Sequence, residues 1–176
     1  GQYAGALAGQ NVGTVSNSYA TGSVSGAQGA GGLVYLNVGT IDASYASAAV
    51  SGVTVAGGLV GANYGNFADA IGLINNSHAS GNVNGIALVG GLVGTNQAAS
   101  IIQGSYATGQ VTATGDDVGG LVGNNEYIIT DSYATGSVTS SGNHVGGLVG
   151  KNVGGATSLS FSRGGAISNS YATGDV

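Results

Sequence analysis

The heptapeptide GGLVGKN, residues 146–152, is one of several near-copies of a single sequence in this chain. GGLVGAN begins at Gly57, GGLVGTN at Gly90 and GGLVGNN at Gly119, while GALAGQN, which begins at Gly5, is a divergent copy. A segment of the SYATG type follows each of them. Self-similarity at a regular period is the signature of a repeat architecture, so the fold has to be argued from the repeat.

Six copies align column by column when the leucine of the heptapeptide is taken as the anchor. Successive anchors are 26, 26, 33, 29 and 27 residues apart. The anchors are Leu7, Leu33, Leu59, Leu92, Leu121 and Leu148. Every copy also has a β-branched residue four positions before an aromatic or imidazole ring, an Ala directly after the ring and a Val five positions after it. Equivalent side chains are therefore expected at equivalent places in a repeated structure.

Short segments in which apolar and polar residues alternate, separated by Gly and Asn, indicate β-strands. Helix is disfavoured because 37 residues are Gly, and each interior Gly costs about 1 kcal/mol relative to Ala. A unit of about three short strands and three turns has the size of one coil of a parallel β-solenoid, whose coils stack about 4.8 Å apart. We predict an all-β, parallel, right-handed β-solenoid that forms one domain over residues 1–176, with about six coils of 26–38 residues.

Stacking of coils gives the recurrent Gly and Asn a structural role. Paired glycines such as Gly31 and Gly32 are expected at corners where a Cβ would crowd the neighbouring coil. Because Gly5 is followed by Ala6, the second site of the pair requires a small residue more than a positive φ. An Asn four residues after each anchor is expected to adopt a left-handed turn and to bond to its counterparts along the axis. This Asn ladder comprises Asn11, Asn37, Asn63, Asn96, Asn125 and Asn152.

A column of rings is expected to point outward, because it alternates with the small and β-branched residues on either side. The ring column comprises Tyr19, Tyr45, His78, Tyr106, Tyr133 and Tyr171. Its first interpretation is structural, since stacked rings stabilise a sheet by about 0.5–1 kcal/mol per adjacent pair. The alternative is a contact surface for sugars or other partners.

Nearly all the variation in repeat length lies between the Asn ladder and the β-branched column. Copy three carries YGNFADAIGL at residues 64–73, and copy six carries GGATSLSFSRGGA at residues 154–166. Both Phe residues and the only Arg, namely Phe67, Phe161 and Arg163, lie in these inserts. Inserts that leave one face of a solenoid are either surface loops or a contact site.

Neither end of the sequence has a polar segment of the kind that caps stacked repeats. Two explanations are open: the chain is part of a longer array, or its ends stack head to tail on other copies and build a fibre.

Composition excludes several functions. Lys151 and Arg163 are the only cationic residues and the net charge is −5, so the chain is not expected to bind nucleic acid. Apolar runs are shorter than the ~20 residues that span a bilayer, and there is no signal-peptide pattern. The absence of Cys excludes disulfides and thiolate metal sites.

Chemistry-bearing residues are sparse and do not converge. His78 and His144 belong to different copies, and no pair of acids recurs at a spacing suited to general acid and base catalysis. We therefore expect no enzyme activity and no cofactor. Asp116 and Asp117 in TGDDV are the candidate ligands for a Ca²⁺ site, although the calcium-binding nonapeptide GGxGxD is missing and a solvated turn is the simpler interpretation.

The repeat resembles the GLUG repeat, named for Gly-Leu-apolar-Gly and written GLVG here at Gly58, Gly91, Gly120 and Gly147. Copies one and two depart from it, with GALAG at Gly5 and GLVYL at Gly32. The resemblance covers nearly the whole chain. It implies a β-solenoid of a large bacterial surface or secreted protein, such as a filamentous adhesin, with no catalytic residues to transfer.

Three functions are therefore expected. The first is a structural segment of an extracellular or cell-surface fibre or adhesin, a stiff rod that spaces or presents loops. The second is a filament subunit that stacks on itself through open solenoid ends. The third is a carbohydrate-binding module that uses the ring column and the inserts. The corresponding partners are the chain itself, or surface glycans and proteins.

Overall fold

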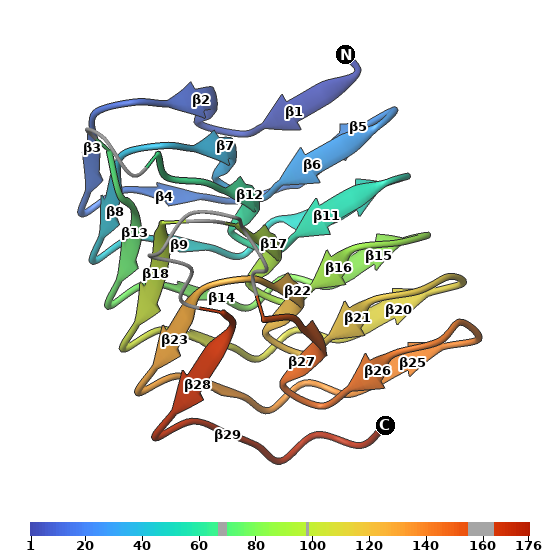
Figure 1. Cartoon of the computed structure of the whole chain (residues 1–176). Coiled ribbons are helices and arrows are strands. Elements are labelled where there is room, and N and C mark those ends of the chain that lie inside the picture. Colours follow the sequence, from blue (N-terminus) through green and yellow to red (C-terminus); the bar gives the residue numbers. More distant parts are fainter. Residues whose placement is uncertain (67–69, 98, 155–163) are drawn as a thin grey trace.

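The computed structural model describes residues 1–66, 70–97, 99–154 and 164–176. Its strands follow one another in five parallel sheets, which we call sheets A to E in the order in which the chain visits them (Figure 1). Every pair of neighbouring strands is parallel, and each coil is bonded to the coils before and after it. The predicted all-β parallel solenoid is confirmed, whereas its handedness stays a prediction.

The strands are short. Sheet A contains β1 (Tyr3–Gly5), β6 (Gly29–Gly31), β11 (Val55–Gly57), β16 (Val89–Gly90), β21 (Val118–Gly119) and β26 (Val145–Gly146). Sheet B contains β2 (Ala8–Asn11), β7 (Val34–Asn37), β12 (Val60–Asn63), β17 (Val93–Asn96), β22 (Val122–Asn125) and β27 (Val149–Asn152). Sheet C contains β3 (Thr14–Ser16), β8 (Thr40–Asp42), β13 (Gly72–Asn75), β18 (Ser100–Gln103), β23 (Ile128–Thr130) and β28 (Ala166–Ser168). Sheet D contains β4 (Tyr19–Ala20), β9 (Tyr45–Ala46), β14 (His78–Ala79), β19 (Tyr106–Ala107), β24 (Tyr133–Ala134) and β29 (Tyr171–Ala172). Sheet E contains β5 (Ser23–Gly26), β10 (Ala49–Gly52), β15 (Val83–Gly85), β20 (Val111–Ala113) and β25 (Val138–Ser140).

Two details of the prediction were wrong. Each full coil has five strands instead of about three, and the chain makes five complete turns followed by a sixth layer in which the described residues form four strands. Each coil has five strands because the chain changes direction at more places than the spacing of Gly and Asn in the sequence indicates. A residue with positive φ separates sheet C from sheet D in every coil, as at Ala43 and Asn76, and divides one expected strand into two.

The cross-section has two parts, each with its own core. Sheets B, C and D surround a core of Leu, Ile, Val and Ala, which we call the body. Sheets E and A pack face to face through Val and Ala alone and form a narrower fin that extends to the right of the body in Figure 1. Only small side chains fit in the fin, because sheets E and A face each other so closely that larger ones would have no room.

The anchors form the predicted continuous spine. Leu33, Leu59, Leu92 and Leu121 are completely buried, and the amide N of each donates a hydrogen bond to the carbonyl oxygen of the next anchor, as in Leu59 N to Leu92 O at 2.9 Å. Leu7 and Leu148 continue the spine at either end, with the same backbone bonds to Leu33 and Leu121. Equivalent residues of successive coils therefore lie directly above one another.

Candidate functional site

The ring column forms one continuous stack on the outer face of sheet D. Neighbouring ring centroids are 4.6–5.3 Å apart, and the ring planes are within 9° of parallel. Strand register imposes this arrangement, because Tyr45 pairs with His78 and His78 with Tyr106 across adjacent strands. The predicted outward stack is confirmed at Tyr19, Tyr45, His78, Tyr106, Tyr133 and Tyr171.

Packing in the stack changes the acid–base properties of two rings. Partial burial lowers the pKa of the His78 imidazole, because the charged form loses hydration between two rings. Burial also raises the pKa of the Tyr133 phenol, and the neighbouring Tyr106 and Tyr171 phenols add to the effect. The phenolic groups of adjacent coils are therefore close enough to influence one another.

The stacking geometry restricts what the ring column can bind. His78 and Tyr106 each lie face to face with a ring above and a ring below, so only their edges and polar atoms remain for a ligand. Sugars bind aromatic rings mainly through the ring face. Stacking of a sugar against an interior ring of the column is thus sterically blocked, and the carbohydrate prediction would have to rely on hydroxyl contacts.

The Asn ladder runs through the interior of the body. Asn11 is 7% exposed, and Asn37, Asn63, Asn96 and Asn125 are fully buried. Each Nδ2 donates to the Oδ1 of the next coil at 2.8–2.9 Å, from Asn11 to Asn152. The predicted axial bonding is confirmed. The predicted left-handed conformation is wrong: none of these residues has a positive φ, because each ends an extended strand of sheet B.

A different column occupies the left-handed corner. The residue before the Ser of each SYATG segment has φ between 47° and 56°, and this column consists of Asn17, Ala43, Asn76, Gly104, Asp131 and Asn169. Asn, Asp and Gly tolerate this conformation best, and all but one of the six are of these types. That enrichment is a signal by which the sequence could have revealed the corner.

A second internal ladder was not predicted. The backbone N of each Ser donates to the Oγ of the Ser in the next coil at 3.1–3.2 Å, and these residues are Ser18, Ser44, Ser77, Ser105, Ser132 and Ser170. Each Oγ donates in turn to a carbonyl two residues earlier in its own coil, as in Ser77 to Asn75 O at 2.7 Å. Buried polar groups at this corner are therefore satisfied along the axis.

Each of the three glycines around the anchor is required for a different steric reason. A Cβ on Gly57 would overlap the carbonyl oxygen of Val60 in the same coil, and a Cβ on Gly58 would overlap the carbonyl oxygen of Gly91 in the next. Neither has a positive φ, which for the second site, Gly58, is the outcome predicted from Ala6 in the first copy. A Cβ on Gly94, two residues after its anchor, would come within 2.8 Å of Leu88 O, where the body meets the fin.

A family model described as the GLUG motif matches residues 1–25, 85–112, 114–139 and 141–176, well over half of the chain. The chain belongs to the GLUG-motif family. No curated protein and no solved structure matches it significantly.

The GLUG motif can be read directly from the coil. Its first Gly allows close approach of the next coil, and its Leu and apolar residue fill the core of the body. Its second Gly leaves room for the residues at the start of sheet A, which pack against the outer surface of sheet B where the body meets the fin. The unmatched residues 26–84 include the copy in which Tyr35 replaces the second Gly. There the ring lies against Gly29 of the fin and stacks on Tyr3, with centroids 4.6 Å apart. Burial raises the pKa of Tyr35, and Tyr3 adds to this shift.

The inserts of this GLUG protein all leave the solenoid at one corner, between sheets B and C. They join β12 to β13, β17 to β18 and β27 to β28, whereas only two residues join β7 to β8. At the ends of the first insert Tyr64 and Ile71 are 41% and 56% exposed, and Asn66 N donates to Ala70 O at 2.8 Å. Phe67, Phe161 and Arg163, which we predicted as contact residues, lie outside the described residues.

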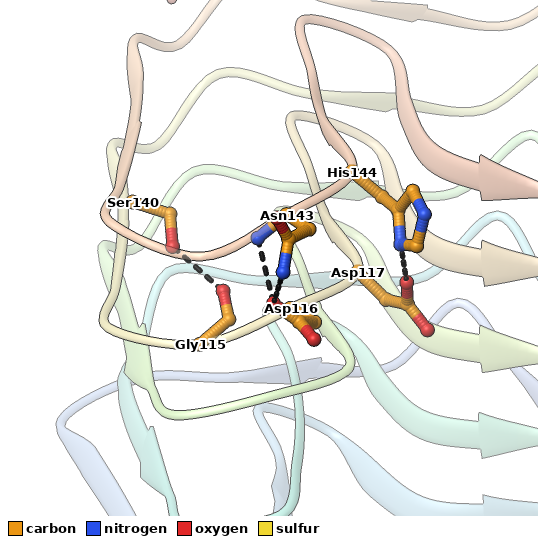
Figure 2. Close-up of polar contacts among 6 residues, drawn as sticks. All are labelled: Gly115, Asp116, Asp117, Ser140, Asn143 and His144. Carbon is orange, nitrogen blue, oxygen red and sulfur yellow. Dashed lines mark hydrogen bonds and ion pairs between the residues drawn. The ribbon is translucent and has the colours of Figure 1, made fainter.

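A cluster of polar side chains connects two coils at the start of the fin's sheet A (Figure 2). Asp116 Oδ1 accepts bonds from the backbone N of Asn143 at 2.6 Å and from its Nδ2 at 3.1 Å, and Asp117 Oδ1 lies 2.8 Å from His144 Nδ1. The backbone bond from Asn143 is the main reason why the pKa of Asp116 is lowered. Each carboxylate therefore already uses Oδ1 within the protein.

Metal and membrane features are absent from the part of the chain that the structure describes. Within those residues, no group of three or more His, Cys, Asp or Glu side chains could hold a metal ion. The Ca²⁺ site at Asp116 and Asp117 stays a prediction with two candidate ligands. No helix that could cross a membrane occurs among the described residues.

Proposed function

We propose that the chain is a structural repeat segment of an extracellular bacterial fibre or adhesin, a stiff rod that presents loops along one edge. The observation that carries this proposal is that the five sheets are the same from coil to coil, while the length of one connection between strands varies. Five sheets continue through the stacked coils in register, while nearly all the added length leaves at the corner between sheets B and C.

Stiffness is supported by the direction of the bonds. Backbone bonds, the Asn ladder and the Ser ladder all join one coil to the next, so bending the rod would have to lengthen several bonds on one side at once. Two cores that run along the same axis resist shear between the body and the fin. These features suit a spacer that holds loops at a fixed distance from a surface.

The spacer role can be tested by pulling on the chain between two well-characterised folded handles. We expect the rod to hold its length until coils detach one at a time. Each coil of 26 residues would add about 90 Å of extended chain, at 3.3–3.6 Å per residue. Gradual lengthening at low force, with no steps of this size, would contradict a rod-like spacer.

Presentation of loops is tested separately. Replacing residues 64–72 by the two residues that join β7 to β8 keeps Leu73 in register with Thr40 and should leave the circular dichroism spectrum and melting temperature nearly unchanged. Loss of binding to immobilised mucin in this variant, with binding kept in a Tyr64→Ser variant of the intact loop, would support loop recognition. Equal binding by all three proteins would count against it.

Self-association is a second candidate, favoured by the like-with-like contacts between coils. Asn bonds to Asn, Ser to Ser, and ring stacks on ring at every interface in the described coils. Any exposed coil surface would therefore match a second copy of the same chain by the same contacts. Sedimentation of the purified chain over a wide concentration range should then show filaments that grow with concentration. A single monomeric species throughout would rule this candidate out.

A further inference from the structure

We propose that the ring column is a site of oxidative cross-linking, where a one-electron oxidant joins stacked tyrosines of neighbouring coils as dityrosine. This inference does not depend on the proposed function, because it rests on the geometry of the phenols alone. Three tyrosine pairs of the column are in direct contact: Tyr19 with Tyr45, Tyr106 with Tyr133, and Tyr133 with Tyr171.

The geometry brings the reacting carbons together before any oxidation occurs. Centroids of Tyr106 and Tyr133 are 4.8 Å apart with an interplanar angle of 3°, and those of Tyr133 and Tyr171 are 5.2 Å apart at 5°. Tyr106 pairs with Tyr133 and Tyr133 with Tyr171 across adjacent strands, so the two rings of each pair lie face to face in register, the approach that coupling between ring carbons needs. Preorganisation of this kind raises the effective concentration of the two partners.

The rings are also accessible to an oxidant. Tyr19 is 62% exposed, Tyr45 37% and Tyr171 55%, and the stack lies along the outside of sheet D. The faces of interior rings such as Tyr106 and Tyr133 are covered by their neighbours, but these rings are only partly buried, so an oxidant can take an electron at the ring edge. Face-to-face stacking of the rings, which prevents a sugar from stacking on an interior ring, is therefore compatible with covalent coupling between neighbouring tyrosines.

The reaction balances as follows. Each of two phenols gives one electron to the oxidant and its hydroxyl proton to solvent, which produces two tyrosyl radicals. The radicals form one carbon–carbon bond between their ortho carbons, and the ortho hydrogens then shift to the oxygens so that both rings regain aromaticity. The pair loses two hydrogen atoms in total. A peroxidase-type oxidant would pass these two electrons and two protons to hydrogen peroxide, giving two molecules of water.

His78 makes the prediction specific. Its imidazole separates Tyr45 from Tyr106, with one stacking distance of 5.1 Å on one side and one of 4.6 Å on the other. The two tyrosines are therefore two coils apart and cannot couple directly. Links are expected on either side of His78 but not across it.

The test uses the purified chain at low concentration, oxidised by light-activated ruthenium trisbipyridyl with persulfate. We expect dityrosine fluorescence, a mass lower by two hydrogen atoms per link, and linked peptides that join Tyr106 to Tyr133, Tyr133 to Tyr171 or Tyr19 to Tyr45. The linked protein should also unfold at a higher urea concentration, because a covalent bond between coils restricts the unfolded chain.

Matched variants separate stacking from simple exposure. Tyr133→Phe keeps a ring in the stack but should abolish both links at that position, while Tyr64→Phe, outside the column, should leave the yield unchanged. His78→Tyr should create new links to Tyr45 and Tyr106. Cross-linking that is mainly between molecules, or that is equally efficient in urea-unfolded protein, would overturn the proposal.

Discussion

The Asn ladder offers a sharp test of what holds the coils together, and Asn96 is the best position for it. Its side chain is fully buried, donates from Nδ2 to Asn125 Oδ1 at 2.8 Å and accepts from Asn63 Nδ2 at 2.9 Å. Truncation to Ala removes both ladder bonds, together with a long contact from Nδ2 to Ile128 O at 3.5 Å. Asn63 Nδ2 keeps its bond to Gly72 O at 2.8 Å, but Asn125 Oδ1 loses its donor in a buried environment.

The magnitude follows from these two unequal losses. An orphaned buried acceptor costs about 1–3 kcal/mol, and a lost bond whose donor keeps another partner costs about 1 kcal/mol. Asn96→Ala should therefore reduce the free energy of unfolding by about 2–4 kcal/mol, before any cavity is counted. Because stacked repeats need not unfold in one step, the loss should be concentrated in the coils that contain β17 and β22.

Asn124→Ala is the matched control on the neighbouring coil. Its Nδ2 donates only to Glu126 Oε1 at 3.0 Å, and its buried Oδ1 has no partner among the described residues. The same truncation there should change stability by less than about 1 kcal/mol. Urea unfolding followed by circular dichroism, together with amide hydrogen exchange, measures both variants. Equal effects of Asn96→Ala and Asn124→Ala would refute the ladder as a source of stability.

Three further predictions concern the core, the coil contacts and the ring column. Leu92→Ala should destabilise by about 2–5 kcal/mol in urea unfolding because Leu92 is fully buried, and Leu7→Ala, at a side chain 50% exposed, should have less than half that effect. Gly91→Ala should lower the melting temperature sharply or prevent folding, since its Cβ would overlap the carbonyl oxygen of the next coil, while Gly13→Ala, with no atom within 4 Å, should be nearly neutral. For His78 the folded pKa is lowered, so the unfolded chain binds the proton first, and stability should fall as pH drops below the unfolded value of about 6.5. His78→Tyr should weaken this dependence in melting curves taken between neutral and mildly acidic pH, and an unchanged slope would contradict it.

Repetition in the sequence was sufficient to predict the class of fold and most of its ladders. Periodic columns imply stacking, because only a stack gives the same environment to the same residue in every copy. The spine of anchors, the axial bonding of asparagines such as Asn63, and the outward ring column all follow from this logic. The inserts also fall at one corner, since length was added at one point of the repeat.

Only the tertiary structure decided how each coil bends. A column pattern says which residues are equivalent, but it does not say which of two turn-forming residues adopts positive φ, since that depends on the directions of the flanking strands. The structure assigns the left-handed corner to positions such as Ala43 and not to the ladder asparagines, and thereby produces five strands in each full coil. Separation into body and fin likewise emerges only when the coils stack, because the Val and Ala side chains of sheets E and A form a second continuous core across several coils.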